Sequence, residues 1–225
     1  MASLKSFLQG VAPILGVSLA TLYERQRALV RLGVLPPSTG AGPGSGVPFT
    51  AENFAAILIS ILASDSLSDV DQSMVALFKA KPEIPSDWDW GRSEKRSDGT
   101  SFWSELTPRG KPTFLRDVAL VLSGYTAKVF WEEHEEAYEL VWTIGDITGV
   151  RVSRVWRGQI VVKVGDSSFF ASYHSSKNRP ARAISITAEI EGDMLNRLIS
   201  FTKDALSQPK GLGPELGQAE EKDDA

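Results

Sequence analysis

The segment between Ser18 and Leu32 carries side chains that could contact DNA. On a helix with about 100° per residue, one side of this segment is apolar and the opposite side is basic. The apolar side holds Leu22, Leu29 and Leu32, and the basic side holds Ala20, Glu24, Arg27 and Arg31, with Tyr23 beside them. Arginine can bind phosphates or form a bidentate pair with guanine, and a tyrosine hydroxyl can contact a phosphate. We therefore expect the apolar side to dock on the protein and the basic side to face DNA.

The first turn of this helix would lie closest to the bases. Thr21 could donate a hydrogen bond there, and Leu19 or Ala20 could contact a thymine methyl group. Arg25 lies at the edge of the docked side, where its aliphatic stem could carry the guanidinium outward to a phosphate. The expected DNA-binding residues are therefore Ser18, Leu19, Ala20, Thr21, Tyr23, Arg25, Arg27 and Arg31. The alternative is an ordinary amphipathic surface helix whose arginines are only solvated.

The residues before this helix fit a helix-turn-helix unit. Such units place a small residue in the first helix, a tight turn with glycine, and a second helix in the major groove of DNA. Ala12 supplies the small residue, and Gly16 and Val17 supply the turn. Leu22 falls where the second helix must touch the first. The spacing therefore predicts that the helix starting after Ser18 is a recognition helix.

Residues 1–36 resemble the helix-turn-helix segment of MerR-like and related winged-helix bacterial and phage regulators. The resemblance rests on the string Gly16-Val17-Ser18 to Thr21-Leu22-Tyr23-Glu24-Arg25, ending in Leu32-Gly33-Val34-Leu35-Pro36. A weaker but longer similarity is to uncharacterised helix-turn-helix proteins of alphaproteobacterial prophage-type regions, in which a glycine-rich loop and a Thr-started apolar helix follow. The resemblance implies a DNA-reading role for Ser18, Leu19, Ala20, Tyr23 and Arg27. It does not identify an effector.

Other motifs do not indicate catalysis or a metal site. The glycine-dense loop 40–46 lacks the preceding strand and the Gly-Lys-Ser or Gly-Lys-Thr ending of phosphate-binding loops, so we expect a hinge or a wing-like loop. The acidic run 132–136 contains one histidine, and the next one, His174, follows 40 positions later, which is not a metal-ligand spacing. No Gly-x-Ser-x-Gly elbow is present in the sequence. We therefore expect no catalytic residue, no metal and no cofactor.

A second basic region lies in the C-terminal half. Residues 150–190 hold seven basic residues against two acidic ones. Within it, Lys177, Arg179 and Arg182 belong to or follow a polar loop that could touch phosphates, and we predict an accessory DNA contact there. The alternative is a solvated surface loop.

The composition limits the class of protein. The 225 residues are 42% hydrophobic, which is enough for one large or two small domains with buried cores. The absence of cysteine excludes disulfides and thiolate metal sites. The longest apolar run, Phe54–Ala63, is half the roughly 20 residues that a bilayer-spanning helix needs, so we expect no membrane span and a cytoplasmic protein. The net charge of −4 reflects an acidic end, because residues 215–225 hold five acidic residues and one basic residue. Residues 1–35, by contrast, hold four basic residues and one acidic residue.

The elements that must position these residues follow from periodicity. Helical spacing predicts helices from Leu4, over 18–32, over about 51–63 after Thr50, from Ser66 or Ser68 to about Lys79, over 113–123 and over 192–206. Runs of β-branched and aromatic residues between 129 and 190 predict about five strands. The expected fold class is α+β, with an N-terminal all-α helix-turn-helix domain and a small C-terminal antiparallel sheet with flanking helices.

Four zones result from this assignment. Residues 1–80 would form the DNA-binding domain, and residues 81–112 a linker with a cluster of Trp88, Trp90 and Trp103. Residues 113–207 would form an α+β domain for dimerisation or effector sensing. Residues 208–225 would be a disordered acidic tail, since they hold almost no bulky apolar group.

The function predicted from these patterns is a sequence-specific transcriptional regulator of phage or bacterial type. Helix 18–32 would enter the major groove of double-stranded DNA, the chain could form a homodimer, and the acidic tail could bind a protein partner. Two alternatives remain open. One is a phage-type accessory protein of DNA packaging or replication, and the other is an adaptor that binds proteins and not DNA.

Overall fold

The computed structural model describes residues 3–38, 46–67, 70–83, 113–124, 129–131, 140–142, 147–153, 157–164, 167–174 and 187–207. The helices of this part are α1 (Leu4–Leu15), α2 (Leu19–Arg31), α3 (Ala51–Ala63), α4 (Gln72–Phe78), α6 (Phe114–Leu122) and α7 (Gly192–Ser207). The strands are β1 (Lys81–Glu83), β2 (Val129–Trp131), β3 (Leu140–Trp142), β4 (Ile147–Ser153), β5 (Arg157–Val164), β6 (Ser167–His174) and β7 (Thr187–Glu191).

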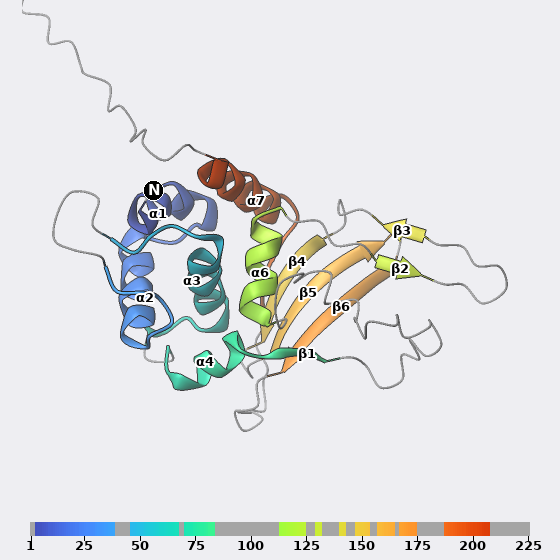
Figure 1. The fold of residues 1–225 in the computed structure, drawn as a ribbon, viewed down its shortest axis with the longest axis horizontal. Coiled ribbons are helices and arrows are strands. Elements are labelled where there is room, and N and C mark those ends of the chain that lie inside the picture. The colour runs from blue at the N-terminus through green and yellow to red at the C-terminus, as the bar shows by residue number, and fades with distance from the viewer. Residues whose placement is uncertain are drawn as a thin grey trace, which may run out of the picture.

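The main sheet is antiparallel throughout, with the strand order β1-β6-β5-β4-β7. Its register places Val150 of β4 opposite Ile160 of β5 on one side and opposite Ile190 of β7 on the other. Strands β2 and β3 pair with each other in a separate antiparallel ribbon. The helices gather beside this sheet (Figure 1). The predicted α+β class is therefore confirmed.

Hydroxyl side chains begin four of the helices. Ser3, Ser18, Thr50 and Thr113 precede α1, α2, α3 and α6, and each side chain accepts a hydrogen bond from the backbone N–H three residues later. This bond satisfies one of the N–H groups that have no partner inside a helix, which fixes where the helix starts. The helix boundaries therefore lie where capping residues occur in the sequence.

Helix α3 is the centre of the fold. Residues 54–59 are completely buried, and a helix that is apolar on all sides needs partners on all sides. Those partners are α2 and α6, together with β4 and β7 of the sheet. One continuous hydrophobic core therefore joins the N-terminal helices to the sheet.

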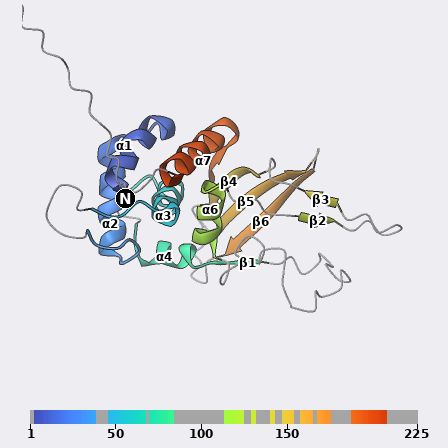
Figure 2. The same ribbon diagram turned by 45° about the horizontal axis from the view of Figure 1, so that its top comes forward.

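Helix α7 links the end of the described chain to its beginning. It contacts α1 and α6 as well as β4 and β7, and it lies along the helical layer in both views (Figures 1 and 2). The ring of Phe201 packs directly on Gly10, where a Cβ would overlap with it, and the centroids of the Phe7 and Phe201 rings are 5.1 Å apart. The C-terminal helix thus rests on the first helix of the predicted DNA-binding unit.

The elements differ from the prediction at two places. Helix α4 begins at Gln72, later than the predicted start at Ser66 or Ser68. Residues 81–83, which the sequence placed in the linker, form strand β1 and pair with β6. The sequence Lys-Pro-Glu has little strand propensity, so this strand depends on the backbone hydrogen bonds that β6 offers. The rest of the linker with its tryptophans, the tail, and Lys177, Arg179 and Arg182 lie outside the described residues.

Candidate nucleic-acid interface

A tight turn joins α1 to α2. Gly16 adopts a left-handed conformation with φ of 63°, and its N–H donates to the carbonyl of Ala12. A left-handed residue at this place favours glycine, because other residues meet a steric penalty from Cβ. The N–H of Val17 also donates to the Ala12 carbonyl, at 3.2 Å. The chain therefore changes direction within three residues and enters α2 after Ser18.

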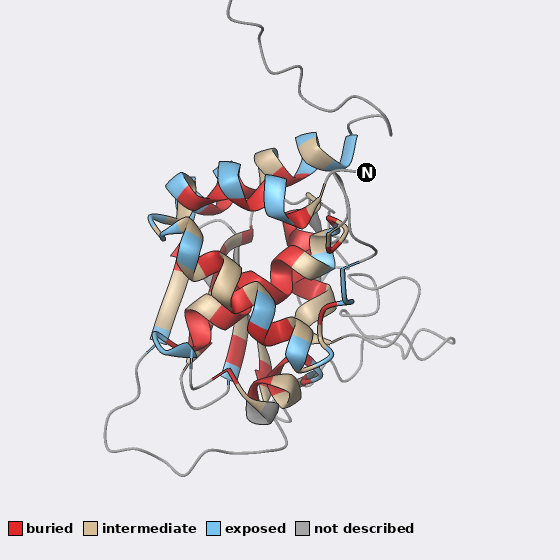
Figure 3. Cartoon of the chain, turned by 90° about the vertical axis from the view of Figure 1, so that its left-hand side faces the viewer, coloured by how far each residue is buried: buried red, intermediate tan, exposed pale blue. Residues whose placement is uncertain are grey.

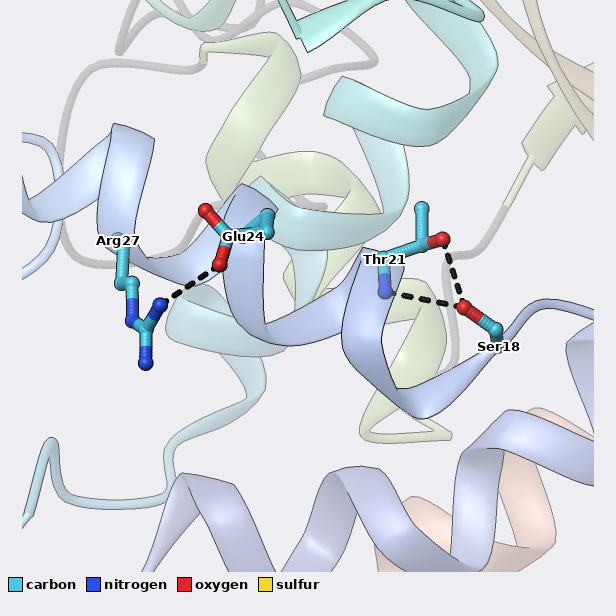
Figure 4. A network of polar contacts seen from close by, with 4 residues as sticks. All are labelled: Ser18, Thr21, Glu24 and Arg27. Carbon is cyan, nitrogen blue, oxygen red and sulfur yellow. Dashed lines mark hydrogen bonds and ion pairs between the residues drawn. The ribbon is translucent and has the colours of Figure 1, made fainter.

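Ser18 and Thr21 form the cap that starts α2. The Thr21 N–H donates to Ser18 Oγ at 3.1 Å, and the two hydroxyl oxygens are 2.8 Å apart (Figure 4). Ser18 is exposed and Thr21 is half-buried. The Thr21 hydroxyl can form further hydrogen bonds, because a hydroxyl can donate one bond and accept two and only one of these three is used by Ser18.

The apolar side of α2 is docked as the sequence predicted. Leu22 and Leu29 are fully buried and Ala28 is 3% exposed. The helix contacts α1 and α3 through this side. Leu32 differs slightly, since it caps the helix and is only half-buried.

The opposite side of α2 is free among the described residues. Ala20, Arg27 and Arg31 are exposed, and Leu19 and Glu24 are half-buried. Helix α2 lies at the outer edge of the helical layer, away from the sheet (Figure 1). Figure 3 views the molecule from this edge and shows exposed residues alternating with buried ones along the helices.

Glu24 and Arg27 form an ion pair on this free side. Arg27 Nη1 lies 2.6 Å from Glu24 Oε1 (Figure 4). The side chain of Arg27 is 72% exposed and that of Glu24 is 46% exposed. Exposed pairs of this kind contribute about 0–1 kcal/mol, because water screens both charges. Arg27 can therefore exchange this carboxylate for another anion at little cost. Sequence reasoning placed Glu24 on the correct side but assigned it no role.

Arg25 does not have the role predicted from the sequence. It is only 2% exposed, and its guanidinium donates to the carbonyls of Ser60 at 2.6 Å and Ser64 at 2.5 Å. These carbonyls belong to the last turn and the C-cap of α3, where carbonyl groups have no partner inside the helix and the helix dipole favours a cation. Arg25 therefore points inward and ties α2 to the end of α3, so it cannot reach a DNA phosphate.

Tyr23 also departs from the prediction. The residue is half-buried, and its hydroxyl oxygen is buried without a hydrogen-bond partner in the part of the chain that the structure describes. A hydroxyl in that position cannot contact a phosphate. The ring, by contrast, has the ammonium group of Lys5 5.5 Å from its centroid. Lys5 comes from the first turn of α1 and was not among the predicted contact residues.

A buried polar pair lies away from this interface, between α6 and the sheet. Tyr173 of β6 donates its hydroxyl proton to Asp117 Oδ2 of α6 at 2.7 Å, and both residues are 0% exposed. Burial raises the pKa of Asp117 to about 7 from its ordinary value of 3.8, against the opposing effects of the Tyr173 hydrogen bond and the Arg116 charge. Burial and the neighbouring Asp117 raise the pKa of Tyr173 well above 10. Without access to solvent, the pair ties α6 to β6.

No local pattern in the sequence marks this pair. Its two members stand 56 residues apart, and Asp117 lies in the first turn of α6, where an acidic residue is ordinary. Its burial depends on how α6 packs on the sheet. The described residues contain no group of three or more histidine or acidic side chains that could hold a metal ion.

No helix among the described residues is long and apolar enough to cross a membrane. Comparison with protein-family models, with curated proteins and with solved structures found no match to this chain.

Proposed function

We propose that the protein is a sequence-specific DNA-binding regulator that places α2 in the major groove of double-stranded DNA. The observation that carries this proposal is the free side of α2, with Ala20, Arg27 and Arg31 exposed at the outer edge of the fold. The opposite side is fixed by Leu22 and Leu29. A docked helix with a basic outer side is the arrangement that a helix-turn-helix unit uses on DNA.

The dimensions of α2 fit this role. Its 13 residues span about 20 Å at 1.5 Å per residue, and the major groove is about 12 Å wide. The start of the helix would approach the bases, so Ser18, Ala20 and Thr21 could contact base edges, and Leu19 a thymine methyl group. Arg27 and Arg31 lie further along the same side and would bind phosphates or guanine.

The binding would exchange one ion pair for another. Arg27 leaves Glu24, whose exposed carboxylate holds it weakly, and takes a DNA phosphate, where several charges act together and condensed counterions are released. Glu24 then remains beside the groove, where a carboxylate can accept a hydrogen bond from a cytosine amino group. This gives the free side of α2 both a general attraction to DNA and a means of selecting bases.

The test measures binding of the full chain to labelled DNA duplexes by fluorescence anisotropy, with gel shifts on genomic fragments. We expect nanomolar-range binding to a small set of sites, weakening steeply with salt. The Arg27→Ala/Arg31→Ala variant should lose this binding, while the matched Lys79→Ala/Lys81→Ala variant, which removes two exposed charges elsewhere, should keep it.

The outcomes separate the candidate functions. A high-affinity site near the protein's own gene supports a regulator. Equal binding to all fragments contradicts sequence-specific regulation and favours a role in DNA packaging or replication. Absence of binding to any duplex favours a protein adaptor. Full binding by the Arg27→Ala/Arg31→Ala variant rejects α2 as the recognition helix.

A further inference from the structure

Lys5 of α1 lies beside Tyr23 of α2. Its ammonium group is 5.5 Å from the centroid of the Tyr23 ring, which is the range in which a cation is attracted to an aromatic face. Lys5 itself is exposed, so its three N–H donors remain available to solvent or to a ligand. Tyr23 borders the side of α2 that carries Arg27 and Arg31, as helical spacing places it.

The backbone of Lys5 is held firmly in place. The Leu4 N–H donates to the Val47 carbonyl at 2.8 Å, and Ser3 forms a β-bridge with Pro48. The neighbouring side chains of Leu4 and Phe7 are buried. The start of α1 is therefore fixed on the core, and the position of the ammonium depends on the side chain of Lys5 and on what attracts it.

Tyr23 provides that attraction through its ring. The Tyr23 hydroxyl is buried and has no hydrogen-bond partner among the described residues. Tyrosine usually contacts a phosphate through its hydroxyl, so Tyr23 does not contact one directly. The ring face instead attracts the Lys5 ammonium. This contact favours a location of the flexible Lys5 side chain beside α2.

We propose that Lys5 binds a DNA phosphate on the strand that flanks the groove entered by α2, and that Tyr23 is a positioning residue for Lys5. The inference rests on the proposed function. A fixed ammonium beside α2 would add one phosphate contact to those of Arg27 and Arg31. It would come from a different helix and so fix the angle of α2 in the groove, as backbone contacts do in protein–DNA complexes.

The test measures the affinity of the full chain for one duplex at several salt concentrations. Each phosphate contact contributes about 0.9 to the slope of log affinity against log salt. We expect Lys5→Ala to reduce that slope by about 1. The control variant Lys79→Ala removes another exposed lysine and should leave the slope unchanged.

Variants of Tyr23 distinguish the ring from the hydroxyl. Tyr23→Phe keeps the ring, so we expect it to bind DNA with the slope of the unmodified protein. Tyr23→Leu removes the ring, so we expect it to bind DNA more weakly than the unmodified protein. The double variant Tyr23→Leu/Lys5→Ala should then bind no more weakly than Lys5→Ala alone. Circular dichroism spectra establish that each variant is folded before its binding is compared.

Three results would overturn the role of Lys5 and Tyr23 without affecting the proposed function, provided that DNA binding still depends on Arg27 and Arg31. These are an unchanged salt slope in Lys5→Ala, a reduced slope in Tyr23→Phe, and additive losses of affinity in the double variant Tyr23→Leu/Lys5→Ala. Failure of the unmodified protein to bind any duplex, or full binding by the Arg27→Ala/Arg31→Ala variant, would instead reject the proposed function.

Discussion

Replacing Asp117 with asparagine should remove a large pH dependence of stability. Asp117 is completely buried, and its carboxyl accepts a hydrogen bond from Tyr173 while burial raises its pKa to about 7. In the unfolded chain the same carboxyl has its ordinary pKa of 3.8. Between these two values the folded protein holds a proton that the unfolded chain has released.

The size and sign of the effect follow from that difference. Each pKa unit is worth about 1.4 kcal/mol, so a shift of about 3 units corresponds to about 4 kcal/mol. The stabilisation is fully present below pH 3.8 and is lost as the pH rises through 7, because the ionised carboxylate is costly to keep buried. Since domains are typically stable by about 5–15 kcal/mol, an effect of this size would be readily measurable.

The assay is urea unfolding followed by circular dichroism, at constant ionic strength, from about pH 5 to about pH 8. The amide of the Asp117→Asn variant cannot ionise but retains an oxygen that accepts the Tyr173 hydrogen bond. We expect the free energy of unfolding of the unmodified protein to fall by about 3 kcal/mol across this range relative to that of Asp117→Asn. Burying the amide hydrogens of the Asp117→Asn variant can lower the free energy of unfolding, but by the same amount at every pH. This cost shifts the variant's curve of free energy against pH without changing its shape.

A second variant extends the test in the opposite direction. The Tyr173 hydrogen bond lowers the pKa of Asp117, so Tyr173→Phe should raise that pKa further and move the loss of stability to higher pH. Parallel curves for the unmodified protein and Asp117→Asn would refute the reasoning, because they would mean that Asp117 titrates in the folded state as it does in the unfolded chain.

Substitutions at three further positions test how the elements are held together. Arg25→Met removes the hydrogen bonds to two carbonyls at the end of α3 and should lower the free energy of unfolding by about 2–4 kcal/mol in urea denaturation, with Arg25→Lys recovering only part of it. Gly158→Ala would place a Cβ 2.5 Å from the Phe114 ring, and we expect about 1–3 kcal/mol of destabilisation, seen as a lower Tm; an unchanged Tm would show that the ring can move aside. Ser18→Ala removes the cap of α2 and should cost about 1 kcal/mol, whereas Ser18→Asp should keep most of it, as measured by thermal unfolding.

Much of the secondary structure could be predicted from the sequence because it depends on local patterns. Ser18, Thr50 and Thr113 mark helix starts that the structure confirms, and Gly33, with φ of 69°, follows the end of α2. The β-branched and aromatic runs between 129 and 190 correspond to strands β2 to β7. Strand β1 was missed because Lys81–Glu83 becomes a strand only through its partner β6.

The predicted contact residues of α2 show where local reasoning ends. Helical spacing placed Leu22 and Leu29 inside and Arg27 and Arg31 outside, as the structure has them. Arg25 lay at the border between the two sides, and spacing alone could not decide its direction. The end of α3 decides it, because its carbonyls need a donor and lie 35 and 39 residues further along the chain.

Local sequence was enough to predict that a helix follows Gly16, that it starts at Ser18, and that its two sides differ in polarity. These properties depend on backbone conformation and on neighbours within about one turn, which the order of residues specifies. Tertiary packing was needed to show that Arg25 turns inward, that the Tyr23 hydroxyl is buried while its ring faces Lys5, and that Asp117 meets Tyr173. Each of these depends on contacts between residues far apart in the chain, and packing decides there which polar groups keep water and which must find a partner in the protein.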